Sequence, residues 1–159
     1  MRYWFLGKRN FFHCMLSTVF CLLFFCGCSF PRIIVLDDPL SSEEHLNLGV
    51  AYEQNKEYES ALKEYEKALK EHPAAHLYMG NIYFLRNELE NAEYHYKKMI
   101  DKDPGKADAY NNLAWLYYTR RENLKEAEVL ALRAIELNSG KGDIYQDTLK
   151  KIREAMQNE

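Results

Sequence analysis

Apolar and charged positions alternate with helical spacing along most of the chain, and the pattern repeats. The segment Leu48–Tyr52 recurs as Met79–Tyr83 and again as Leu113–Tyr117. Each copy is followed by three small or apolar residues that lie four and then three positions apart. In the first repeat these are Ala61, Tyr65 and Ala68. This spacing places side chains on one face of a helix. The sequence therefore predicts three successive helix pairs.

Helix boundaries are marked by capping residues and prolines. Ser41 and Glu44 have the spacing of a capping box at the start of the first helix. Pro73 and Pro104 should end the second helix of the first two pairs, because proline cannot continue a helix. The first repeat is three residues shorter than the second, so a helix over 74–86 should begin abruptly and be about one turn shorter.

The small and large positions predict how each pair packs. We expect Gly49 to lie against Ala61, so that the two helix backbones approach closely, with Tyr52 and Tyr65 filling the space beside this contact. The third repeat carries one extra residue in its turn and Ala131 where an aromatic residue is expected. Its packing should be looser.

The last stretch of the chain predicts one more helix. Tyr145, Leu149, Ile152 and Met156 share one face, and charged residues occupy the opposite face. A solenoid of helix pairs needs such a helix to cover its last apolar surface.

The recurring positions resemble the tetratricopeptide repeat, whose period is about 34 residues, over residues 42–139. The resemblance implies an all-α fold, a right-handed superhelical solenoid of three helix-turn-helix repeats. The repeats would span about 42–73, 74–106 and 107–139, and a C-terminal capping helix would follow over 140–159.

In this family the first helix of each pair lines a concave groove. The resemblance implies a partner-binding groove made of Leu46, Val50, Leu77, Asn81, Phe84, Asn111, Trp115 and Tyr118. Glu53 is a further position that would face this groove. Aromatic rings could bury a partner's side chains, and amides could pair with an extended backbone. Two alternatives stay open: the aromatic residues could be buried between repeats, or Ile33–Leu36 of the same chain could occupy the groove.

A subset of the family clamps the C-terminal carboxylates of heat-shock chaperones with Lys, Arg and Asn. At the corresponding positions this chain has Leu46, Val50, Tyr78, Asp108 and Asn112. The basic half of the clamp is missing, which disfavours a receptor for chaperone tails.

The N-terminal residues indicate a targeting segment. Arg2, Lys8 and Arg9 precede the apolar run Cys14–Phe25, and residues 1–27 contain no acid. Basic residues followed by a short apolar core are typical of a secretory signal.

The end of this run resembles the lipobox of bacterial lipoproteins. In Phe25–Cys28 a small residue directly precedes a cysteine, which implies lipidation of Cys28, removal of a signal peptide over 1–27, and a tether over 28–41. The alternative is an uncleaved membrane anchor over about Phe11–Phe30, since about 20 residues are long enough to span a bilayer. In both cases the repeats would be tethered to a membrane. Ser29 is not the Asp that typically retains lipoproteins at the inner membrane, so the outer membrane is favoured.

Composition excludes several classes of function. The 159-residue chain has room for one domain, and its net charge of −3 becomes −6 after residue 27, which argues against a broad nucleic-acid surface. All four cysteines lie at or before Cys28, so the body cannot hold a disulfide or a thiolate-bound metal.

No common catalytic signature is present in the sequence. His72 and His76 have the spacing of two metal ligands on one helix, but Pro73 between them should split them between two helices. We expect no catalytic residue, no metal site and no cofactor.

Together these patterns predict a non-catalytic protein–protein interaction scaffold, membrane-tethered in the bacterial cell envelope and facing the periplasm or exterior. It would bind a peptide or helix of an unidentified partner in its groove. The alternative is a structural subunit or pilotin-like assembly factor of a secretion, pilus or outer-membrane machine, with an interface on the convex helices around Tyr58, Leu62 and Tyr94.

Overall fold

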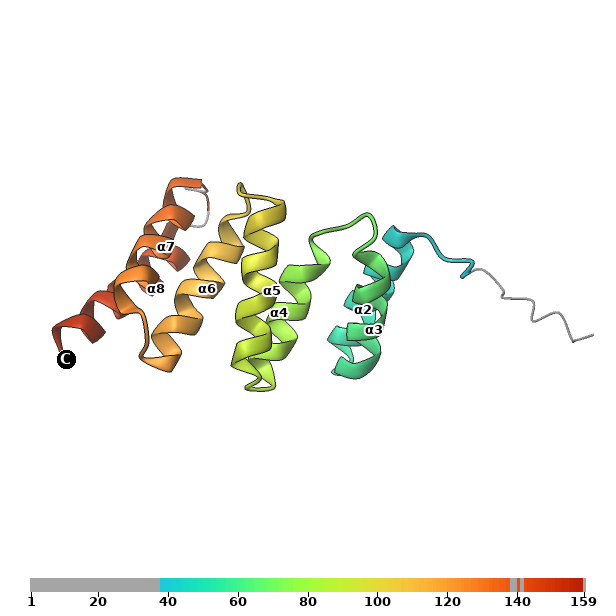
Figure 1. The fold of residues 1–159 in the computed structure, drawn as a ribbon, viewed down its shortest axis with the longest axis horizontal. Coiled ribbons are helices and arrows are strands. Elements are labelled where there is room, and N and C mark those ends of the chain that lie inside the picture. The colour runs from blue at the N-terminus through green and yellow to red at the C-terminus, as the bar shows by residue number, and fades with distance from the viewer. Residues whose placement is uncertain (1–37, 138–139, 141, 159) are drawn as a thin grey trace, which may run out of the picture. The chain divides into compact units, whose positions relative to one another are not determined.

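The computed structural model describes residues 38–137, 140 and 142–158. Seven helices and no strand occur within these ranges (Figure 1). They are α2 (Ser42–Gln54), α3 (Tyr58–Ala68), α4 (Ala75–Leu85), α5 (Leu89–Lys102), α6 (Ala107–Arg120), α7 (Leu124–Leu137) and α8 (Gly142–Gln157). Cys28, the signal segment and residues 28–37 of the tether lie outside the described residues.

Residues 38–159 form a compact unit of their own. Within it the helices pack as three consecutive pairs, α2 with α3, α4 with α5, and α6 with α7, and α8 packs on α7 and α6. Each pair also contacts the next through α3 with α4 and α5 with α6. This confirms the predicted all-α solenoid of three helix-turn-helix repeats and a C-terminal helix.

The predicted helix boundaries are found in the structure. The Ser41 side chain accepts a hydrogen bond from the Glu44 backbone at 3.2 Å, and the Glu44 carboxylate accepts one from the Ser41 backbone at 2.8 Å. These bonds complete the capping box, and the backbone N–H and the hydroxyl of Ser41, which both donate to the Glu44 carboxylate, lower the pKa of Glu44. α3 and α5 both end before the predicted prolines, and α4 has 11 residues where α6 has 14.

The turn inside each pair contains a residue in the left-handed backbone region. Lys56 and Asn87 occupy this place in the first two repeats, with φ of 63° and 58°. The third turn, which has the extra residue, contains two such residues, Arg121 and Asn123. The added residue is therefore accommodated in the turn, and both helices of the third pair are full length.

The packing of Gly49 differs from the prediction. A Cβ atom at Gly49 would lie 2.5 Å from Cε1 of Tyr65, so the aromatic ring of the second helix, and not the backbone at Ala61, fills the space nearest this glycine. Gly80 meets the ring of Tyr96 in the same way, also at 2.5 Å.

In the third repeat, two alanines replace the glycine and the tyrosine that meet in the other repeats. Ala114 stands where the other repeats have glycine, and Ala131 stands where they have tyrosine; both are fully buried. A methyl group can be present on the first helix because no ring comes from the second. The looser packing expected there stays a prediction.

α8 presents its predicted apolar face to the third pair. Tyr145, Leu149 and Ile152 are buried, and the Tyr145 hydroxyl donates to the Asp108 carboxylate at 2.8 Å. An ion pair between Arg153 and Glu128 at 2.6 Å joins α8 to α7 at the surface. None of the helices in the described ranges combines the length and apolar character needed to cross a membrane.

Candidate functional site

A pocket of about 360 Å³ lies across the first helices of the three repeats. Its lining consists of Glu53 from α2, Asn81, Phe84 and Leu85 from α4, Tyr96 from α5, and Asn112 and Trp115 from α6. The structure thus brings together Asn81, Phe84 and Trp115, three of the eight residues predicted for the groove.

The other predicted groove residues lie elsewhere. Leu77 and Asn111 are each only 8% exposed, and Leu77 is part of the hydrophobic core. Leu46 and Val50 are half-buried and pack against the core of the first repeat. Tyr118 lies beside Trp115, outside the pocket lining. Whether these residues bind a partner stays a prediction.

Two amides form the polar centre of the pocket. Asn81 Oδ1 accepts one hydrogen bond from the Tyr96 hydroxyl at 3.0 Å and another from Asn112 Nδ2 at 2.9 Å. Within the described part of the chain, Asn81 Nδ2 and Asn112 Oδ1 have no hydrogen-bond partner. The pair can therefore offer one donor and one acceptor to a ligand, which is what a peptide unit requires.

Glu53 supplies the charge at the α2 end of the pocket. Its Oε2 atom accepts a hydrogen bond of 2.5 Å from the Tyr65 hydroxyl. Burial and the neighbouring carboxylate raise the pKa of Tyr65, so the phenol keeps its proton at any physiological pH. Among the described residues that line the pocket, Glu53 alone is charged.

Aromatic and basic groups gather at the α6 end. The rings of Trp115 and Tyr118 are 5.0 Å apart, and Lys151 Nζ from α8 lies 5.1 Å from the Trp115 ring centre. Lys151 also pairs with Asp147 at 2.6 Å, which raises the pKa of the lysine. The pocket therefore runs from an acidic end on α2 to an aromatic end that has a cation nearby.

Leu85, Tyr96 and Asn112 are not among the predicted groove residues, although Asn112 occupies a position of the chaperone clamp. The ring of Tyr96 packs against Gly80, and its hydroxyl reaches the pocket. Asn112 follows the predicted Asn111 by one position, a rotation of about 100° around a helix. Asn111 and Asn112 lie four and three positions before Trp115, and both spacings share a helix face, so spacing alone does not distinguish them.

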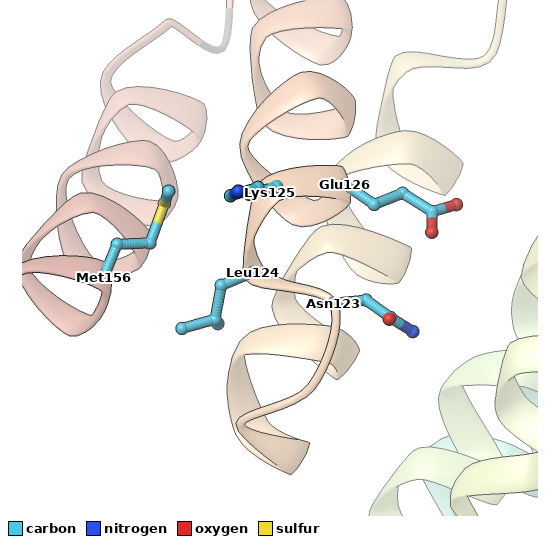
Figure 2. Close-up of a pocket in the computed structure, with 5 residues that line it drawn as sticks. All are labelled: Asn123, Leu124, Lys125, Glu126 and Met156. Atoms are coloured by element: carbon cyan, nitrogen blue, oxygen red, sulfur yellow. The ribbon is translucent and has the colours of Figure 1, made fainter. Parts of the chain in front are cut away.

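A second pocket of about 470 Å³ lies at the start of α7. It is lined by Asn123, Leu124, Lys125, Glu126 and Met156 (Figure 2). Figure 2 shows Leu124 and Lys125 on the side of Met156, and Asn123 and Glu126 directed away from it. These side chains diverge, so they offer a ligand no shared set of polar groups.

Two histidines meet between α4 and α5. His76 Nδ1 lies 2.9 Å from His95 Nδ1. The prediction that Pro73 splits His72 and His76 between two helices is wrong for His72, because α3 already ends at Ala68 and His72 lies in the connection before α4. Burial lowers the pKa of His95 to about 4. Across the described ranges, no group of three or more His, Cys, Asp or Glu residues is arranged to hold a metal ion.

Comparison with known proteins identifies the repeats. Two family models, both described as tetratricopeptide repeat, match the chain, one over residues 32–74 and 46–107 and the other over 95–128. No curated protein sequence matches the chain.

Several solved structures share the fold. The first tetratricopeptide domain of Spaghetti (RPAP3), bound to the HSP90 peptide SRMEEVD, has a TM-score of 0.68 and 20% identity, covering 76% of this chain and 96% of that one. The Sgt2 domain from Aspergillus fumigatus has a TM-score of 0.66 and 21% identity, with coverages of 73% and 79%. The TPR2B domain of yeast Sti1, in a complex with pHsp70, has a TM-score of 0.66 and 17% identity, with coverages of 71% and 96%.

Proposed function

The chain belongs to the tetratricopeptide repeat family, and from this premise we propose that it is a non-catalytic scaffold that binds a segment of a partner protein in the pocket on α2, α4 and α6. Domains of this family are typically protein-interaction modules. The proposal assigns the docking site to one surface of the solenoid.

The amide pair carries this proposal. Asn81 Nδ2 and Asn112 Oδ1 present a donor and an acceptor side by side, and neither has a partner in the described ranges. Trp115 and Phe84 supply apolar surface next to them. A segment with a free peptide unit and one large apolar side chain would satisfy both features.

The similar structures support peptide binding by this fold, while the residues of this chain at the clamp positions favour a different ligand. The RPAP3 domain holds an HSP90 peptide, and the Sti1 domain is in a complex with pHsp70. This chain has Leu46, Val50 and Tyr78 at three positions of the chaperone clamp, so the cations that would pair with a C-terminal carboxylate are missing there.

The proposal includes a membrane tether in the bacterial cell envelope. The support is the basic and apolar N-terminal segment, which ends in a lipobox-like sequence at Cys28. An uncleaved membrane anchor is the alternative. We place the scaffold on the periplasmic or exterior side, with the outer membrane favoured. The intact mass of the mature N-terminus distinguishes a lipidated Cys28 from an uncleaved chain.

The alternative, a structural subunit or assembly factor, uses the convex helices. Tyr94 is 55% exposed and outside the pocket lining, as a convex interface requires. Leu62 is 9% exposed and belongs to the core of the first repeat, so it offers little surface to such an interface, which stays a prediction.

Partner capture by altered full-length chains tests the proposal. Asn81→Asp keeps the acceptor that Tyr96 and Asn112 use but replaces the free donor with an acceptor. Combined with Trp115→Ala, it should abolish co-purification of a partner from membranes while the circular dichroism spectrum stays unchanged. Tyr94→Ala is the matched control and should retain the partner. Retention by the pocket variant, with loss in the Tyr94 variant, would contradict the proposal and favour the structural alternative.

A further inference from the structure

We propose that the partner segment carries a lysine or arginine that pairs with Glu53, next to a large apolar side chain that packs on Phe84 and Trp115. This inference rests on the proposed function and specifies its ligand. The recognised unit is a cationic residue beside an apolar one in an extended segment.

Glu53 lines the pocket and has no ion-pair partner among the described residues, unlike three acids on α3 and around the start of α5. Glu59 and Glu88 both pair with Arg86, at 3.1 Å and 2.7 Å, and Glu93 pairs with Arg120 at 3.1 Å. Among the described residues, the only hydrogen-bond partner of the Glu53 side chain is the Tyr65 hydroxyl, on Oε2. Its Oε1 atom is therefore available to a ligand.

The surroundings hold this carboxylate in one place. The Tyr65 ring is fully buried, lies over Gly49, and stacks on Tyr78 with ring centres 5.3 Å apart. Its hydroxyl donates to Glu53 and cannot ionise at physiological pH because burial and Glu53 raise the pKa of Tyr65. A carboxylate already ordered by a neutral donor loses less entropy when a cation binds.

Partial enclosure makes a cation the complementary group. Glu53 shares the pocket with Phe84, Leu85 and Trp115, which are poor hydrogen-bonding neighbours for a charge. A partner ammonium or guanidinium would offset the lost hydration through a charge-assisted hydrogen bond. A carboxylate of the partner at this position would instead bring like charges together.

The opposite end of the pocket sets the direction of the segment. Lys151 lies over the Trp115 ring but is paired with Asp147, so among the described lining residues the uncompensated charge is that of Glu53, at the α2 end. The amide pair joins α4 to α6, and Glu53 comes from α2. The cation therefore lies toward α2 and the apolar side chain toward α4 and α6.

Selection from a peptide library tests the inference. The probe is a library of short synthetic peptides with free positions and blocked ends, applied to residues 38–159, which form a compact unit with their own core. We expect the retained peptides to be enriched in Lys or Arg beside a large apolar residue. Replacing that cation with glutamine should lower the affinity about three- to tenfold, and high salt should weaken only the cationic peptide.

Variants make the outcome decisive. Glu53→Gln keeps an acceptor for Tyr65 and should remove the preference for a cation, whereas the exposed Glu57→Gln control should keep it. Retained peptides that depend on Trp115 but show no preference for a cation would overturn the inference and leave the proposed function standing. If no retained peptide depends on Trp115, both are overturned.

The chain's own tether is a competing occupant, because Arg32 precedes the apolar run Ile33–Leu36. The same selection with residues 29–159 addresses it. We expect the same peptides to be retained. Loss of binding in this longer chain, with recovery when Arg32 is replaced by glutamine, would make the tether the occupant and overturn the assignment to a partner.

Discussion

At the residue scale, two tyrosines connect the packing of the repeats to the candidate site. The rings of Tyr65 and Tyr96 fill the space over Gly49 and Gly80, and their hydroxyls hold Glu53 and Asn81 in the pocket. The same side chains therefore determine how closely two helices approach and how the polar groups of the pocket are placed.

The glycine–tyrosine contact predicts a specific coupling. Gly49→Ala should lower the free energy of unfolding by about 1–3 kcal/mol, because the new methyl group would collide with the Tyr65 ring. Combining it with Tyr65→Ala should cost less than the sum of the two single changes, since the third repeat pairs Ala114 with Ala131. Urea unfolding of the four proteins measures the coupling, and strictly additive costs would contradict this account of the packing.

The sequence predicts features that depend on neighbouring residues better than features that depend on how the helices pack. The capping box at Ser41 and Glu44 is local, and the sequence predicts it correctly. The position of the Tyr65 ring over Gly49 depends on a side-chain rotamer in the packed pair, which repeat spacing does not determine. In the pocket, alignment to repeat positions found Asn81 and Trp115 but chose Asn111, whereas the helix turns Asn112 toward the pocket.

At the scale of the elements, α4 and α5 are joined by a pair of neutral histidines. His95 is buried, stacks on Tyr83 with ring centres 5.3 Å apart, and lies 2.9 Å from His76 through their Nδ1 atoms. Lys98 and Lys102 also lower the pKa of His76, after burial as the main cause. Protonation of both rings would place two like charges in contact.

This helix pair should therefore lose stability in mild acid. Folding lowers the pKa of His95 from the usual 6.5 to about 4, so the unfolded chain takes up a proton first as the pH falls. The stability that the neutral histidines contribute should be complete above about pH 6.5. The free energy of unfolding should then fall by on the order of 1 kcal/mol by about pH 5, with allowance for solvent screening at His76.

Urea unfolding at several pH values checks the loss. His95→Gln should flatten the dependence in this window, and His72→Gln, outside the contact, should preserve it. Equal slopes for the His95 variant and the parent protein would contradict the assignment.

At the scale of the molecule, three helix pairs and α8 place groups from successive repeats around one pocket. α2 supplies an acid, α4 and α6 supply amides and aromatic rings, and α8 brings Lys151 to the far end. The isolated helices would not produce this order of charges. Stacking of the repeats creates an oriented binding surface, which is the central claim of this account.

Site-resolved photo-crosslinking in cells tests that claim most directly. A photoreactive phenylalanine derivative is placed at Leu85, which lies in the pocket lining and is 64% exposed, or at Tyr94, which lies outside the lining and is 55% exposed. We predict that Leu85 crosslinks one partner through a defined segment, and that Asn81→Asp with Trp115→Ala abolishes this product. A partner captured from Tyr94 but not from Leu85 would contradict the account.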